Sequence, residues 1–257
     1  MDSITSFLSN LPWPDFNVPW HEYYRDLFWA TLETLKFTAV SYVGAIFLAS
    51  LLALCRTSGL ALLSGPAAIF SESLKNLPLL TWLFILYYGL TNFSIVLSTF
   101  AAGALALSTF YGAYIGEIFR AAIDGIDKGQ REAAQAIGLG PLRTVTSVVL
   151  PQAVRLALPG TATMLVDLLK GTSLLVTIAG AELMTAGQIL TSVTFESLEV
   201  YSVIGLIYFA LCYPTSQLVL VLERNLRKGI PMTPARRHLF RQVRARQAQV
   251  AAQGGIS

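Results

Sequence analysis

Long stretches without a charged side chain recur along the 257-residue chain and set its organisation. The 19 residues 37–55 carry no charge, and neither do the 41 residues 76–116 or the 23 residues 200–222. A helix needs about 20 apolar residues to cross the hydrocarbon core of a bilayer, at about 1.5 Å per residue. The run 76–116 is therefore too long for one crossing, and the pattern predicts several membrane-spanning helices.

Breaks between these stretches divide the chain into five predicted spans. Gly65 and Pro66 open the second span, since proline suits the first turn of a helix. Pro78 is expected to kink it, because proline removes a backbone hydrogen bond from a helix interior. The predicted spans lie near residues 37–55, 66–90, 94–119, 151–179 and 200–222, separated by a polar turn at 89–93, a charged loop at 117–147 and an acidic loop at 181–199. The predicted fold class is an all-α integral membrane protein with five transmembrane helices.

The composition supports a membrane protein. Charged residues make up 13% of the chain and hydrophobic residues 54%, with a mean hydropathy of +0.59. Soluble domains are about 25% charged, so roughly half of the usual charge is missing. This deficit excludes a disordered chain and argues against an ordinary cytosolic enzyme.

The distribution of basic residues predicts the orientation in the membrane. Lysine and arginine accumulate in short cytoplasmic loops, and 14 of the 18 basic residues fall on one predicted face. The turn at 89–93 and the loop at 181–199 have none. We therefore predict an outer N-terminal segment (1–26), a transmembrane domain (27–228) and a basic cytoplasmic tail (229–257).

The charged loop contains a pattern that predicts a short surface helix. Asp127 is placed to cap the start of this helix, and Glu132 lies near its positive end, where the helix dipole favours an acid. Ala133 and Ala134 leave room for another protein to approach closely. Gly138, followed by Gly140 and Pro141, is expected to end the helix. A second short helix should follow, with Leu142, Val145 and Val149 as an apolar stripe against the membrane. The loop therefore reads as a docking element on the cytoplasmic face.

The spacing of this loop resembles a known motif. It reads Glu132-Ala133-Ala134, three residues, Gly138, nine residues, then Val148-Val149-Leu150-Pro151. This resembles the EAA motif of bacterial ABC-transporter permeases, with Val148 in place of isoleucine. Further similarity in segments 78–80, 86–90, 113–120, 128–130 and 170–174 points to the polar amino acid uptake branch (histidine/glutamine/arginine-type permeases), over roughly residues 27–228.

The resemblance implies the partners and the task. Such permeases pair, as homodimers or paralogous heterodimers, around a path for polar amino acids or related compounds such as opines. A pair of ATP-binding subunits drives them, a periplasmic solute-binding protein delivers the substrate, and the assembly lies in the bacterial inner membrane. The coupling helix between the third and fourth spans contacts the ATPase, and the residues assigned to this contact are Glu132, Ala133, Ala134, Gly138 and Pro151.

Hydrolysis of ATP is expected on another polypeptide. The chain has no Gly-x4-Gly-Lys-Ser/Thr sequence to hold phosphates. We therefore expect neither an enzyme nor a catalytic residue here, and no cofactor in this chain. No metal site is expected either, because Cys55 and Cys212 lie far apart in apolar runs.

Charged residues at membrane depth are the candidates for the substrate path, because each costs at least about 2.5–3.5 kcal/mol to insert. Asp167 and Lys170, with Thr172 and Ser173 after them, either line the path or form a self-contained ion pair. Lys75, three residues after Glu72, either lies in the path or extends toward the interface. Related permeases often carry an acidic residue at the position of Gly171, and this chain departs from that pattern.

Two other classes of function fit the sequence less well. An ion-gradient-driven secondary transporter or channel predicts repeat-related spans with paired ionisable groups, and neither is evident. A membrane enzyme needs a nucleophile with a base or a metal, and His21 and His238 fall on opposite sides of the predicted membrane. The tail arginines are expected to contact anionic lipids rather than nucleic acid: Arg236, Arg237, Arg241, Arg244 and Arg246.

Overall fold

The computed structural model describes residues 18–228, and this part of the chain is helical without any strand. The predicted basic tail, with its five lipid-contacting arginines, lies outside the described residues, as do residues 1–17 of the predicted outer segment. The elements are α2 (Trp20–Thr57), α3 (Ala61–Lys75), α4 (Leu79–Phe84), η1 (Ile85–Gly89), η2 (Leu90–Phe93), α5 (Thr99–Asp124), α6 (Lys128–Ala136), α7 (Pro141–Thr144), η3 (Val145–Val149), α8 (Leu150–Gly171), η4 (Thr172–Ile178), α9 (Leu183–Thr194) and α10 (Ser197–Lys228).

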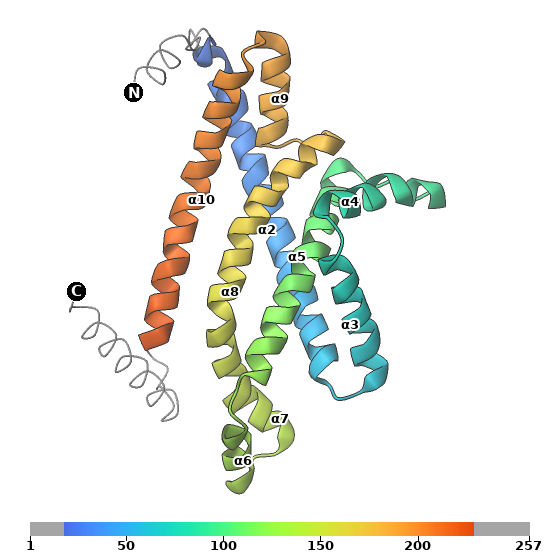
Figure 1. The fold of residues 1–257 in the computed structure, drawn as a ribbon, viewed down its shortest axis with the longest axis vertical. Helices are drawn as coiled ribbons and strands as arrows, with labels where there is room; N and C mark the ends of the chain where they lie inside the picture. Colours follow the sequence, from blue (N-terminus) through green and yellow to red (C-terminus); the bar gives the residue numbers. More distant parts are fainter. Residues whose placement is uncertain (1–17, 229–257) are drawn as a thin grey trace, which may run out of the picture.

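Four long helices run along the molecule (Figure 1), with α5 packed against both α2 and α8, and α10 against the other side of α8. The short helices α6 and α7 lie at one end, and α9 lies at the other. Helix α3 returns beside α2, and the segment α4–η2 projects sideways from the bundle. The predicted charged loop (117–147) and acidic loop (181–199) therefore lie at opposite ends of the bundle.

Three described helical segments have the length and apolar composition of membrane spans: Trp20–Thr57, Pro141–Ile178 and Ser197–Val221. They contain the predicted spans 37–55, 151–179 and 200–222 almost completely. A fourth candidate is the bent pair formed by α3 with Leu79–Phe93. Helix α5 contains most of the predicted span 94–119 but is not among the helices of this class, so three described segments belong to it, or four with the bent pair.

The predicted second span is not one kinked helix. Its chain breaks between Lys75 and Leu79, and the two halves meet at 110°. Pro78 has an extended backbone, with ψ of 136°, and a proline also disfavours helical geometry at the residue before it. The three residues between the helices are therefore a sharp turn, where the sequence predicted only a bend.

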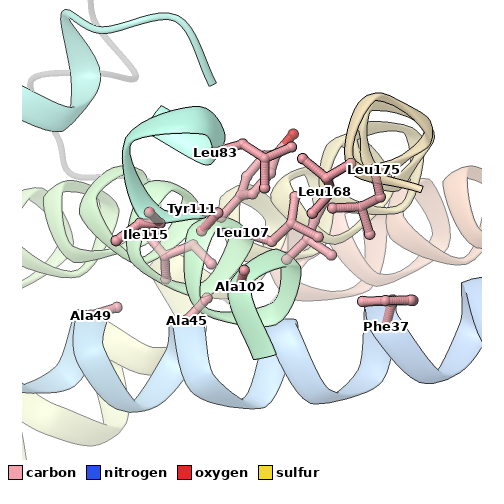
Figure 2. Close-up of a cluster of buried hydrophobic side chains, with 13 residues drawn as sticks. Phe37, Ala45, Ala49, Leu83, Ala102, Leu107, Tyr111, Ile115, Leu168 and Leu175 are labelled. Carbon is pink, nitrogen blue, oxygen red and sulfur yellow. The ribbon is translucent and has the colours of Figure 1, made fainter. Parts of the chain in front are cut away.

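Small residues allow α2 and α5 to pack closely. Ala45 and Ala49 of α2 are fully buried against α5, as Figure 2 shows. On α5, an added Cβ at Gly112 would lie 3.2 Å from the carbonyl oxygen of Ala45, and one at Gly116 would lie 3.2 Å from the Cβ of Leu52. Glycines four residues apart permit this close approach between helices in a membrane. Leu83 of α4, with Leu168 and Leu175, completes the cluster on the other side of α5.

The acidic loop predicted at 181–199 contains a helix instead. Glu182 caps the start of α9, and its carboxylate accepts hydrogen bonds from the amides of Met184 and Thr185, each at 2.8 Å. Tyr208 of α10 donates a third at 2.7 Å. The Glu182 side chain is buried, as is the apolar face of α9 with Leu183 and Leu190. The acidic residues suggested a loop, but the Glu182 carboxylate instead accepts hydrogen bonds from main-chain amides at the start of α9.

Replacing Glu182 with alanine is expected to lower stability by about 1–3 kcal/mol, because buried donors on α9 and α10 lose their acceptor. Thermal unfolding of the full-length protein in lipid nanodiscs measures this. The control is Glu196→Ala, on the connection between α9 and α10, which should unfold within a degree or two of the parent. Equal losses in the two variants would contradict the capping role.

Candidate functional site

The loop between α5 and α8 begins and ends as its sequence predicts. Asp127 caps α6, accepting a 2.7 Å hydrogen bond from the amide of Gly129. At the other end Gly138 has a φ of +81°, the left-handed region that favours glycine. The amides of Gly138 and Leu139 donate to the carbonyls of Gln135 and Ala134. These two bonds form a Schellman ending, which stops α6 at a defined residue.

One side of α6 is free. Ala134 is buried, and α6 packs on η3, whereas Glu132 and Ala133 are exposed. Ile137, just before the glycine, has 77% of its surface exposed. The loop projects from the end of the bundle (Figure 1). The described chain thus presents small, apolar and acidic side chains together on one exposed element.

The second short helix differs from its prediction. Residues 141–178 form one nearly continuous helical run, in which α7 leads through the π-helical turn η3 into α8. Val149 is buried, while Leu142 and Val145 are exposed on the surface of the described chain. Pro151 lies in the first turn of α8, directly after η3. A π-turn accommodates the ring and the missing amide of this proline without ending the helix.

A cavity of about 440 Å³ lies between α4, α5 and α8. Two of the predicted path residues, Asp167 and Lys170, line it. The remaining lining is aromatic and apolar, together with one glycine. Its residues are Leu79, Phe110, Tyr111, Tyr114, Met164, Gly171 and Leu174. A cavity of this size accommodates one small molecule.

The two charged groups in the cavity are only loosely paired. The Nζ of Lys170 lies 4.0 Å from Oδ1 of Asp167, and 61% and 47% of the two side chains remain exposed. By comparison, Lys75 Nζ lies 2.8 Å from Oε1 of Glu72 and is 19% exposed. The structure therefore leaves the charges of Asp167 and Lys170 accessible from the cavity.

The other predicted path residues lie outside the cavity lining. Thr172 is buried and donates its hydroxyl to the carbonyl of Leu169, and Ser173 donates to that of Lys170. Lys75 pairs with Glu72, and its carbonyl accepts a hydrogen bond from Tyr114. These hydroxyls stabilise the local helix, and Lys75 stands beside the cavity rather than in it.

The aromatic part of this site was not predicted from the sequence. Phe110, Tyr111 and Tyr114 stand within a long uncharged run, where aromatic side chains are usually core. The usable signal was the pair of tyrosines three residues apart, because a hydroxyl in such a run needs a partner. Tyr111 donates to the carbonyl of Asp167 at 2.8 Å. An added Cβ on Gly171 would lie 2.7 Å from the Tyr111 hydroxyl, which accounts for the glycine.

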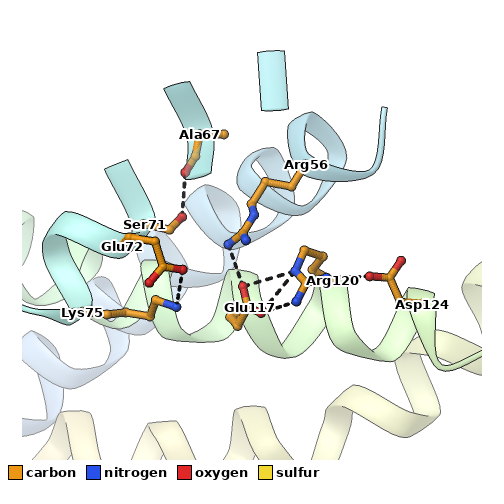
Figure 3. A network of polar contacts seen from close by, with 8 residues as sticks. All are labelled: Arg56, Ala67, Ser71, Glu72, Lys75, Glu117, Arg120 and Asp124. Atoms are coloured by element: carbon orange, nitrogen blue, oxygen red, sulfur yellow. Dashed lines mark hydrogen bonds and ion pairs between the residues drawn. The ribbon is translucent and has the colours of Figure 1, made fainter. Parts of the chain in front are cut away.

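An ionic network joins the end of α2 to α5 (Figure 3). Glu117 and Arg120 pair within α5, and Arg120 also contacts Asp124 at 2.6 Å. Glu117 also accepts a 2.6 Å bond from Arg56 at the end of α2, which the sequence did not reveal. The network therefore fixes the end of α2 against α5.

Similar proteins share this architecture. The chain is 36% identical over 202 residues to a probable amino-acid ABC transporter permease of Sinorhizobium fredii, y4tG, covering 78% of this chain and 87% of that protein. It is 33% identical to the L-cystine transport system permease TcyB of Bacillus subtilis, covering 86% and 97%. The crystal structure of an amino acid ABC transporter with histidines superposes with a TM-score of 0.75 at 30% identity, covering 79% of this chain and 95% of that one. The MetNI methionine ABC transporter shares the fold, with a TM-score of 0.64 at 18% identity, covering 78% and 95%.

The family assignment removes the alternative of an ion-gradient-driven transporter or channel. Residues 45–228 match the family described as the binding-protein-dependent transport system inner membrane component, which is most of the chain. This stretch includes the exposed loop and every residue that lines the cavity. The chain therefore belongs to the inner membrane permease components of binding-protein-dependent ABC transport systems.

Proposed function

We propose that this permease is the membrane subunit of an ATP-driven importer and forms the path by which an amino acid crosses the membrane. The main support for the proposal is the exposed face of α6, which is free to dock on a partner at one end of the bundle. The same bundle holds a cavity with two accessible charges. Amino-acid transport in the names of the relatives supports the choice of substrate. An ATP-binding subunit pair, a solute-binding protein and a second permease subunit complete the assembly, and ATP is hydrolysed on the partner.

The proposed subunit crosses the membrane five times. The crossings are α2, the bent segment α3–η2, α5, the run α7–η4, and α10. Helix α5 has 26 residues, about 39 Å at 1.5 Å per residue, enough to cross a hydrocarbon core of about 30 Å. Five crossings put the two termini on opposite sides of the membrane, and we propose that the N-terminus lies outside and the C-terminus in the cytoplasm. In support, the end of the bundle with α6 carries Lys128, Arg131 and Arg143, whereas residues 179–199 have no basic side chain.

The proposed contact with the ATPase uses the EAA loop. Glu132, Ala133 and Gly138 are exposed, so they are free to meet a partner. Ala134 faces the permease itself, and its small size lets α6 lie close to η3. Pro151 then acts at the junction with α8 and not at the contact surface. A charge-assisted bond from Glu132 to a basic group of the ATPase fits the exposed carboxylate.

Topology is tested by labelling single cysteines in a variant without Cys55 and Cys212. A cysteine at Ser192 on α9 should react with an impermeant maleimide added to whole cells or spheroplasts. A cysteine at Gln135 on α6 should react only after the membrane is opened, because both residues are exposed but lie at opposite ends of the bundle. Labelling of both positions from the same side would overturn the five-span arrangement.

Coupling is tested by Gly138→Asp and Glu132→Lys. A side chain at Gly138 costs about 1 kcal/mol at a positive φ and intrudes on the partner surface, and a lysine reverses the charge offered to the partner. We expect at least a tenfold loss of ATP-driven uptake in proteoliposomes, with normal membrane insertion. The ATPase should be released or should hydrolyse ATP without responding to the binding protein.

The matched control is Gly140→Asp, since Gly140 is exposed in the same loop but has a φ of −66°. It should transport within about twofold of the parent. Normal uptake and normal ATPase co-purification in both test variants would show that this loop is not the coupling element.

A further inference from the structure

The cavity between α4, α5 and α8 has a charge pattern that identifies the kind of amino acid it takes. Of the described residues that line it, only Asp167 and Lys170 are charged, so the lining carries one charge of each sign. Both groups remain about half exposed, and their 4.0 Å separation leaves each able to bind another partner. A matched pair of accessible opposite charges suits a ligand that itself carries both charges close together.

The tyrosine hydroxyls do not add a third free donor. Tyr111 donates its single hydrogen to the carbonyl of Asp167, and Tyr114 donates to that of Lys75. Gly171 contributes no side chain, and the Tyr111 hydroxyl occupies the space where its Cβ would lie. The rest of the wall is apolar and aromatic, including Met164 and Phe110. A charged substrate side chain placed against this wall would meet no counter-charge among the described residues that line it.

We infer that Asp167 binds the α-ammonium group and Lys170 the α-carboxylate of a zwitterionic amino acid, whose uncharged side chain lies against the apolar wall. These two residues then determine specificity: they select the zwitterionic head, and the wall rejects cationic and anionic side chains. The inference rests on the proposed function, since it specifies the substrate of that same path. The charges of the pair then serve the ligand and not only each other.

The test measures direct binding to the full-length permease in lipid nanodiscs, without the binding protein, so that the cavity alone selects. The probes are L-leucine, 3-methylbutylamine, which lacks the carboxylate, and 4-methylpentanoate, which lacks the ammonium group. L-arginine and L-glutamate test whether the apolar wall rejects a charged side chain. L-leucine should bind at least tenfold more tightly than each of the other four, because each charge-assisted bond accounts for about 10- to 100-fold in affinity.

The variants separate the two anchors. Asp167→Asn should weaken the binding of L-leucine by about tenfold or more and leave the binding of 4-methylpentanoate unchanged. Lys170→Met should weaken the binding of L-leucine and leave the binding of 3-methylbutylamine unchanged. A purely structural ion pair does not produce this opposite response to the two half-ligands. Glu33→Gln and Lys36→Met are the matched controls, because they break an acid–lysine pair of the same spacing on α2, away from the cavity. They should bind L-leucine as the parent does.

The possible failures are distinct. This inference is overturned if L-arginine or L-glutamate binds as tightly as L-leucine, or if both variants affect all probes equally. The proposed function still holds in that case, provided that the complete transporter takes up an amino acid in an ATP-driven manner. Absence of ATP-driven uptake of any amino acid by the complete transporter overturns the proposed function itself.

Discussion

The close packing of α5 against α2 is the constraint on which the other features depend. In lipid, apolar surface gains little by leaving its surroundings, so helices associate through tight van der Waals contact. Gly112 and Gly116 let α5 approach the buried alanines of α2 closely. On its other face the same turns of α5 carry Tyr111 and Tyr114, which form one wall of the cavity. A side chain at either glycine would therefore displace both the core and the cavity wall.

The ionisable groups described above fall into three classes, according to their surroundings. Glu182 is buried and accepts several hydrogen bonds, so its carboxylate acts as a fixed structural acceptor. Glu117 is shared between Arg56 and Arg120, which fasten two helix ends together. Asp167 and Lys170 keep most of their capacity for other partners. Burial and pairing thus distinguish the groups that maintain the fold from those that remain available to a ligand.

Much of this arrangement was predictable from local sequence, and the rest depended on tertiary contacts. The ends of α6 followed from Asp127 and Gly138, because capping and a positive φ are properties of a few neighbouring residues. The charged pair on α8 followed from its spacing. The cavity wall did not, since Tyr111 reaches Asp167 from a helix 56 residues away along the chain. Helix α9 was missed because Glu182 finds its third donor in Tyr208, which no local pattern indicates.

The single helix α8 connects the exposed loop to the cavity. Pro151, beside the exposed loop, and Asp167, in the cavity, are 16 residues apart, or about 24 Å along one helix. A helix resists compression far more than bending, so the two ends keep a nearly constant separation along its axis. Pro159 lies midway and lacks the amide that would tie it to the preceding turn. Any bend at this residue therefore changes how the cavity charges are oriented relative to the loop.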